Sequence, residues 1–236
     1  MLELILVLIG GRIGSMSYNI IENDEIIFRE GLDYIQAQYP FYNKETLIDD
    51  YTNIKYSLQM IESSVSGLLD ISEILKIIIF DCIIGNSDRH HSNWGITPYL
   101  RKTDNGNCVY LKLCPLYDNG SSLCSYINEN DVELILKDKM KFEALVNTKS
   151  KSAIGWENYR PIRHFELLKN IKDTYYSSTI KYIEDIQLNI TESSIDGILK
   201  KFDNTIISKD MKRLLKIYIL ERRKRILEIY NLKDEV

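Results

Sequence analysis

Histidine and cysteine are scarce in this sequence, with three histidines and four cysteines among 236 residues. His90 and His91 are adjacent, and adjacent side chains point in different directions in most backbone conformations, so with His164 they make a poor zinc site. The cysteines also lack the close paired spacing of zinc ligands. They are interpreted as buried free thiols in a reducing cytosol, although the sequence leaves a disulfide open. The four are Cys82, Cys108, Cys114 and Cys124.

No apolar run is long enough to cross a bilayer, which takes about 20 residues. The most apolar stretch, residues 1–10, is too short and carries Glu3 where a secretory signal carries basic residues. A buried helix or strand is predicted there instead. The net charge of −4 gives no reason to expect nucleic-acid or membrane binding, and the protein is expected in the cytoplasm.

Repeats and low-complexity linkers are missing as well, and the length suits one large domain or two small ones. The composition, 44% hydrophobic and 27% charged, is that of an ordinary globular protein. Residues 72–84 predict a helix with almost no polar face, capped by Asp70 or Ser72. This helix should be buried at the centre of the larger lobe, and it leads into a loop crowded with ionisable side chains.

Protein kinases carry an acid, then an amide five positions later, then a second acid beyond a hairpin. This sequence has three residues in the same order. These residues are Asp88, Asn93 and Asp118. A carboxylate is needed to orient a substrate hydroxyl, and Mg²⁺ on the nucleotide phosphates prefers hard oxygen ligands. Residues 94–100 and 108–113 predict two antiparallel strands joined by a strong turn signal at 104–107. The hairpin would return the chain so that Asp118 faces Asn93 across one metal ion.

The runs at residues 85–93 (GNSDRHHSN) and 115–123 (PLYDNGSSL) resemble the catalytic core of the HipA-like kinase family. The resemblance covers roughly residues 68–123. It implies a protein-kinase-like fold and phosphorylation of serine or threonine with ATP and Mg²⁺. By match, Asp88 would be the catalytic acid that orients the hydroxyl, and Asn93 and Asp118 would bind Mg²⁺ and, through it, the nucleotide.

Three neighbouring loop residues are given supporting roles: Asn86, Arg89 and His90. His90 is expected to order the loop by hydrogen bonding, and Arg89 to hold a carboxylate or a phosphate. Asp81, near the end of the predicted helix, would pair with Arg89 or cap the loop, which is a structural role.

The expected fold class is α+β, with a mostly α-helical kinase-like large lobe, a small β-hairpin or sheet at the active-site edge and a reduced N-terminal lobe. Residues 1–45 would be the remnant of the small lobe and hinge, and residues 46–236 the helical catalytic lobe. Residues 15–29 suggest a strand hairpin with an acidic tip at 22–25. Further helices are expected over residues 45–63, 129–145, 164–171, 177–190, 193–202 and 208–230.

A kinase small lobe supplies a glycine-rich loop over the phosphates and a lysine that grips them, and neither is evident before Gly85. Three glycines occur within residues 10–14, but the first lysine is Lys44, in a polar segment. Glu3 and residues 17–20 would be remnants of the helix and strand that follow this lysine in the family. The sequence is therefore truncated, completed by another chain, or that of a degraded pseudokinase.

Two alternatives to a protein kinase stay open. One is a binding or regulatory protein of the same fold that is catalytically impaired. The other is a metal-dependent phosphoesterase using Asp88, His90, His91 and Asp118. The expected partners are a protein substrate and a small-lobe or antitoxin-type chain, since some relatives are toxins of toxin–antitoxin pairs. The basic run at residues 221–225 is interpreted as solvated helix surface.

Overall fold

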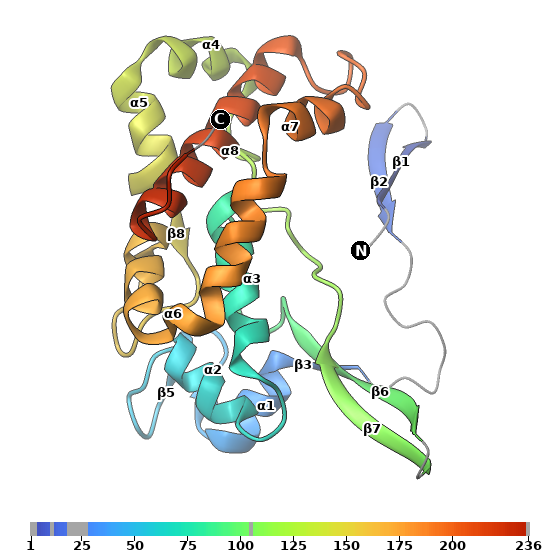
Figure 1. Ribbon diagram of the computed structural model, residues 1–236, viewed down its shortest axis with the longest axis vertical. Coiled ribbons are helices and arrows are strands. Elements are labelled where there is room, and N and C mark those ends of the chain that lie inside the picture. Colours follow the sequence, from blue (N-terminus) through green and yellow to red (C-terminus); the bar gives the residue numbers. More distant parts are fainter. Residues whose placement is uncertain (1–3, 10–11, 18–27, 104–105, 235–236) are drawn as a thin grey trace.

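The computed structural model describes residues 4–9, 12–17, 28–103 and 106–234 (Figure 1). Helices form most of the body, and the strands form small antiparallel sheets at its edge. The acidic tip predicted at residues 22–25, Glu3 and most of residues 17–20 lie outside the described residues. The predicted fold class, α+β with a mostly helical large lobe, is confirmed.

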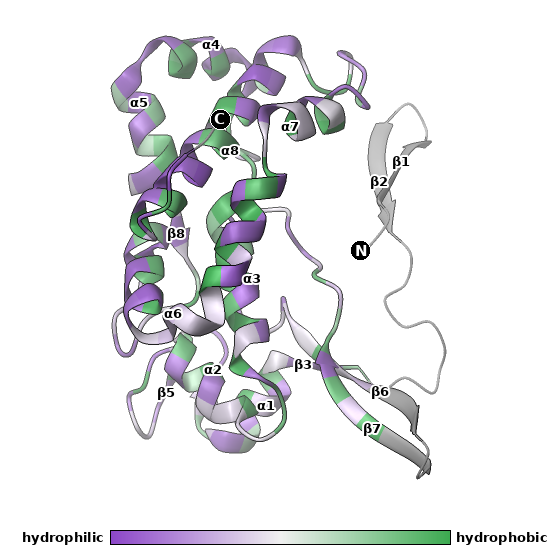
Figure 2. Cartoon of the chain, viewed as in Figure 1, coloured by the Kyte–Doolittle hydropathy of each residue, from purple (hydrophilic) through white to green (hydrophobic). Residues whose placement is uncertain are grey.

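The helices of the described residues are distributed along the chain from residue 31 to residue 229. They are α1 (Gly31–Gln38), α2 (Leu58–Val65), α3 (Ile71–Ile84), α4 (Glu129–Lys137), α5 (Lys139–Glu143), the π-helical turn η1 (Ala144–Thr148), α6 (His164–Asn189), α7 (Glu192–Leu199) and α8 (Lys209–Ile229). Most of these helices carry both polar and apolar residues (Figure 2), as expected for helices with one buried face and one exposed face.

Within the described residues, the strands pair in four small antiparallel sheets. They are β1 (Leu4–Ile9) with β2 (Arg12–Ser17), β3 (Arg29–Glu30) with β6 (Gly95–Thr103) and β7 (Gly106–Leu113), β4 (Tyr42–Asn43) with β5 (Ile48–Asp49), and β8 (Lys151–Ser152) with β9 (Ile162–Arg163). The predicted hairpin is present as β6 and β7, whose register runs from the Ile96–Leu113 pair to the Thr103–Gly106 pair. It projects away from the helices in Figure 1.

Helix α3 is buried, as its apolar sequence predicted, and among the described residues it contributes to two hydrophobic cores. Leu75 and Ile78 pack in the core formed with α1 and α2, whereas Cys82 and Ile83 pack in the core formed with α6 and α8. The helix begins at Asp70, whose carboxylate accepts a 2.8 Å hydrogen bond from the backbone N–H of Ser72. A helix held in this way is a rigid support for the loop that follows it.

The helix predicted over residues 45–63 is wrong for its first two thirds, because only α2 is helical there. Asp49 is buried, and its Oδ1 accepts hydrogen bonds from the backbone N–H and the hydroxyl of Thr52. Leu47 and Asn53 have positive φ angles of 59°. A side chain that satisfies backbone donors locally competes with the helix and produces a turn instead.

The C-terminal helices agree with their predicted ranges. Ser208 caps α8 by accepting a hydrogen bond from the backbone N–H of Met211. The two helices predicted over residues 164–171 and 177–190 are the two parts of α6, which are separated by a kink with non-helical backbone angles at Tyr175 (φ −122°, ψ 33°). Interpreting residues 221–225 as solvated surface is wrong for Arg222 and Arg223, which are 0% and 1% exposed, whereas Lys224 is exposed.

Two further observations concern the cysteines and the helix lengths. Cys82, Cys114 and Cys124 are buried free thiols, as predicted. In the part of the chain that the structure describes, no helix combines the length and the apolar character needed to cross a bilayer.

The burial of α3 predicts a strong asymmetry between two Ile→Ala substitutions. Ile78 is 1% exposed, so Ile78→Ala should lower the free energy of unfolding by about 2–5 kcal/mol, since it leaves a cavity. Ile198 on α7 is 57% exposed, so Ile198→Ala should change the free energy of unfolding by less than about 0.5 kcal/mol. Urea denaturation measures both. Equal denaturation midpoints would contradict the central position of α3.

Candidate active site

The loop after α3 begins at Gly85, which ends the helix with a φ of 68°. A side chain is excluded here, because a Cβ atom on Gly85 would lie 1.9 Å from the hydroxyl oxygen of Tyr218. The positive φ and the close contact together require glycine. They turn the chain sharply out of α3 into the polar segment.

Asn86 is the buried anchor of this segment, at 1% exposure. Its Oδ1 accepts a 3.1 Å hydrogen bond from the backbone N–H of Asp88, and its Nδ2 donates to Asp81 at 3.1 Å. Its backbone carbonyl accepts a 2.9 Å hydrogen bond from Nε2 of His164. The carboxylate of Asp88 itself is exposed. Asn86 thus holds the backbone of Asp88 while leaving its side chain accessible.

Asp88 and Asn93 belong to one tight turn. The backbone carbonyl of Asp88 accepts hydrogen bonds from the backbone N–H of His90 at 2.9 Å and from Nδ2 of Asn93 at 2.6 Å. The side chain of Asn93 is buried, at 4% exposure. Because this contact uses the nitrogen of the amide, its oxygen is the atom that would serve a cation.

Arg89 points the opposite way from Asp88, into the interior, and is 1% exposed. Each of its five N–H donors has an acceptor. Nε and Nη2 donate to the two carboxylate oxygens of Asp81 at 3.0 and 2.8 Å. Nη1 donates to the backbone carbonyls of Asn93 and Tyr117 at 2.7 and 2.8 Å, and Nη2 also donates to Oδ1 of Asn119 at 2.6 Å.

This one guanidinium joins three separate segments: the end of α3, the turn that holds Asn93, and the residues on both sides of Asp118. The expected pairing of Asp81 with Arg89 is present, so the group that Arg89 holds is a carboxylate. Burial raises the pKa of Asp81, and the Arg89 guanidinium opposes that rise by favouring the charged form.

Asp118 follows β7 and has an exposed side chain and a positive φ of 49°. Its segment is tied to the first loop by more than Arg89. The hydroxyl of Tyr117 donates a hydrogen bond to the backbone carbonyl of Ser92 at 2.7 Å. The backbone N–H of Ser87 donates to the backbone carbonyl of Ser121 at 3.2 Å. The structure therefore brings the segments of Asp88, Asn93 and Asp118 together, with both carboxylates open to solvent.

The two loop histidines have different environments. Nδ1 of His90 accepts a 3.2 Å hydrogen bond from the backbone N–H of Ser92, which leaves Nε2 as the donor, 3.9 Å from the Asp88 carboxylate. His91 is buried, 3.1 Å from the hydroxyl of Tyr42 and edge-on to the ring of Tyr56. Burial lowers the pKa of His91 to about 4, so its ring is neutral at pH 7.

The donor set suits Mg²⁺ rather than a metal held only by protein. Within the described ranges, no group of three or more histidine, cysteine, aspartate or glutamate side chains is arranged to hold an ion. Asn93 and Asp118 offer one amide oxygen and one carboxylate, which are hard ligands. Mg²⁺ commonly takes one or two protein oxygens and completes its shell with phosphates and water, so these residues fit it.

Several residues that hold the site carry no signal in the sequence. Asn119 was missed although it adjoins Asp118, and its role depends on Arg89 reaching it from 30 residues away. Tyr56 donates to the backbone carbonyl of Arg89 at 3.2 Å and accepts a hydrogen bond from the indole N–H of Trp94 at 2.9 Å. His164 contacts Asn86 from 78 residues away. Residue spacing cannot reveal such contacts.

The fold is kinase-like: it is a mostly helical lobe with a loop and a hairpin at its edge, and these carry Asp88, Asn93 and Asp118. Among solved structures, a Helicobacter pylori proinflammatory kinase, CtkA, has this fold, with a TM-score of 0.74 over 97% of this chain and 72% of that one. The two sequences are 16% identical, so the likeness concerns the fold. No protein-family model and no curated protein matches the sequence.

The Arg89 contacts predict a large loss of stability when the guanidinium is removed. Arg89→Met leaves the Asp81 carboxylate buried without its charged partner, with only the Asn86 hydrogen bond remaining, and should lower the free energy of unfolding by about 3–5 kcal/mol. Adding Asp81→Leu should recover part of that loss, because no buried charge remains. Arg163→Met is the control, since Arg163 has an exposed ion pair with Glu166. An Arg89→Met protein as stable as the control in urea would contradict this description.

Because His164 is buried, we expect the protein to lose stability in mild acid. Burial is the main reason that the pKa of His164 is lowered, from 6.5 to about 3. The unfolded chain gains a proton below pH 6.5 that the folded chain does not, so stability falls as the pH drops from 6.5 towards 3. This residue alone should cost about 1.4 kcal/mol between pH 7.5 and 5.5.

Urea unfolding at these two pH values tests the effect. His164→Gln should reduce the pH difference by about 1.4 kcal/mol, because glutamine does not titrate. Ile78→Ala should keep the full difference while lowering stability at both pH values. A His164→Gln protein with the wild-type pH dependence would show that this imidazole is not the group responsible.

Proposed function

We propose that this chain is a HipA-like kinase that transfers the γ-phosphoryl group of ATP to a serine or threonine hydroxyl of a protein. The observation that carries the proposal is the Arg89 contact set, which joins the Asp88–Asn93 turn to the Asp118 segment in a kinase-like fold. Kinases need these three side chains in register, because phosphoryl transfer depends on positioning and charge stabilisation.

Asp88 would orient the substrate hydroxyl and accept its proton as the oxygen attacks the phosphorus. Its carboxylate is exposed while its backbone is held by Asn86, so it combines access with a defined position. Asn93 and Asp118 would hold Mg²⁺, which when bound neutralises charge on the phosphate oxygens. Asn86, Arg89 and His90 would support the loop, His90 through the hydrogen bond it accepts from the Ser92 N–H.

One observation favours a second candidate, a catalytically impaired or split kinase that binds or regulates. The first lysine of the sequence, Lys44, is exposed in the turn between β4 and β5 and does not lie on a strand. It is therefore poorly placed to grip nucleotide phosphates. We propose residues 1–45 as the remnant of a small lobe and hinge, and a small-lobe or antitoxin-type partner chain as the source of the missing groups, in the cytoplasm.

The phosphoesterase alternative is less well supported. Its four groups do not face one site, because the His91 ring is buried against Tyr42 whereas the carboxylates of Asp88 and Asp118 are exposed. A phosphoesterase would hydrolyse a generic phosphoester without nucleotide, and that activity would survive Asn93→Ala.

Two substitutions separate the roles of the acids. Asp88→Asn should lower kcat for phosphoryl transfer by about 10²–10⁴-fold, because the hydroxyl loses its base, while ATP binding stays within about twofold. Asp118→Asn should weaken ATP binding in Mg²⁺ by at least about tenfold, because a metal ligand is lost. Calorimetric titration with ATP, with and without Mg²⁺, and a phosphate-transfer assay measure these effects.

Asp131→Asn on α4 is the matched control, since Asp131 is exposed and belongs to no contact of the site. Activity of Asp88→Asn and Asp118→Asn equal to that of the control would refute the assignment. Mg²⁺-dependent ATP binding without transfer in the wild type would instead favour the binding or regulatory protein.

A further inference from the structure

Arg222 is a buried cation at the back of the candidate active site. Its side chain is 0% exposed, and among the described residues no carboxylate pairs with it. Nε donates to the backbone carbonyl of Cys82 at 2.6 Å, and Nη1 donates to the carbonyl of Val146 at 2.6 Å and to the Ser150 hydroxyl at 2.8 Å. A buried charge with this partner set needs a physical explanation.

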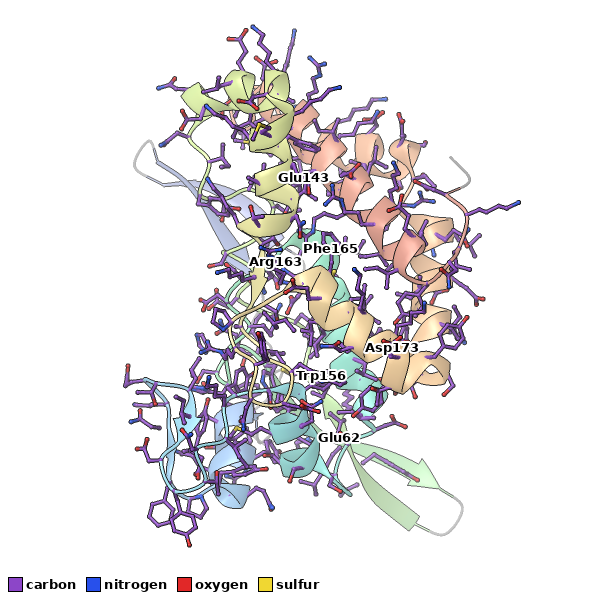
Figure 3. The ribbon with its side chains drawn as sticks, turned by 90° about the vertical axis from the view of Figure 1, so that its left-hand side faces the viewer. Glu62, Glu143, Trp156, Arg163, Phe165 and Asp173 are labelled. Atoms are coloured by element: carbon purple, nitrogen blue, oxygen red, sulfur yellow. The ribbon has the colours of Figure 1, made fainter. Side chains whose placement is uncertain are left out.

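The ends of two helices supply the compensation. Cys82 lies in the last turn of α3 and Val146 lies in η1, so both carbonyls belong to the negative end of a helix. Aromatic faces cover the guanidinium as well, with Cζ 4.9 Å from the ring centre of Phe165 and 5.3 Å from that of Tyr218. Figure 3 shows Phe165 where α6 begins.

A chain of hydrogen bonds leads from Arg222 to the catalytic loop, and each link has one possible direction. Arginine only donates, so the Ser150 oxygen accepts from it. The Ser150 hydroxyl then donates to Nδ1 of His164 at 2.9 Å, which places the ring proton on Nε2. Nε2 donates to the backbone carbonyl of Asn86 at 2.9 Å, and a carbonyl can only accept.

The far end of the chain is Asp88. Asn86 receives the His164 hydrogen bond on its backbone, and its side chain holds the Asp88 N–H and the Asp81 carboxylate. Helix α8, remote in sequence, is thereby linked to the residue proposed as the catalytic base. Three apolar side chains of similar volume would pack the same space without the cost of burying a cation and two polar groups.

We propose that Arg222, Ser150 and His164 are positioning residues that hold the Asn86 carbonyl, and with it Asp88, in the geometry required for phosphoryl transfer. The inference rests on the proposed function for its effect on rate. Its structural part, the directed chain from α8 to the loop, stands independently. An ordered polar network specifies one arrangement of the groups that it joins, whereas apolar packing tolerates several.

Ser150→Ala and His164→Leu break the chain at successive links. Each should lower kcat by roughly 10–100-fold with the KM for ATP within about twofold, because a misplaced base slows the chemical step and not nucleotide binding. His164→Gln should recover most of the loss, since its amide nitrogen can donate to Asn86. Amide hydrogen exchange at Asp88 should become at least about tenfold faster in the first two variants.

Thr179→Val is the matched control. It removes a buried hydrogen bond between the Tyr230 hydroxyl and α6, at a place with no link to the loop. The proposal is overturned if Ser150→Ala and His164→Leu lower kcat no more than this control does. It is also overturned if nitrogen NMR of His164 shows the proton on Nδ1 instead of Nε2.

A different set of results is expected if the proposed kinase function is wrong. If the wild-type chain transfers no phosphate under any condition, the rate comparison is lost, but Asp88 amide exchange and the His164 tautomer still decide whether the chain from α8 positions the loop. Unchanged exchange at Asp88 in Ser150→Ala would then overturn the proposal by itself.

Discussion

The candidate site depends on one buried guanidinium with five donors, that of Arg89. Two of its hydrogen bonds reach Asp81 on α3, one reaches the turn of Asn93, and two reach the residues that flank Asp118. A lysine could not replace it, because an ammonium is a point charge with three donors, whereas the planar fork of arginine can satisfy several segments at once.

The support for that group is α3, which belongs to both hydrophobic cores. It delivers Asp81 into the interior and ends at Gly85, where only glycine fits beneath Tyr218. On the opposite side of the same helix end, Arg222 binds the carbonyl of Cys82. Two buried arginines thus meet the C-terminal end of α3, one paired with a carboxylate and the other compensated by helix ends and aromatic rings.

Much of the architecture could be predicted from local pattern. The cap and apolar run of α3, the paired strands β6 and β7, and the Ser208 cap of α8 are properties of neighbouring residues, which is why these elements were predicted correctly. The helix expected over residues 45–63 failed over residues 45–57 because buried Asp49 satisfies the Thr52 backbone and stabilises a turn. Burial of that carboxylate depends on packing, which periodicity does not contain.

By itself, the sequence determined the order of Asp88, Asn93 and Asp118 along the chain, which is a covalent fact, together with the helix that precedes them and the hairpin between Asn93 and Asp118. Only the tertiary structure decided that Arg89 faces inward to join these segments and that Arg222, in a run that reads as surface, lies buried behind the loop. The physical reason is that both arginines are partnered by groups between 4 and 140 residues away in sequence, brought within hydrogen-bonding distance by the packing of α3, α6 and α8.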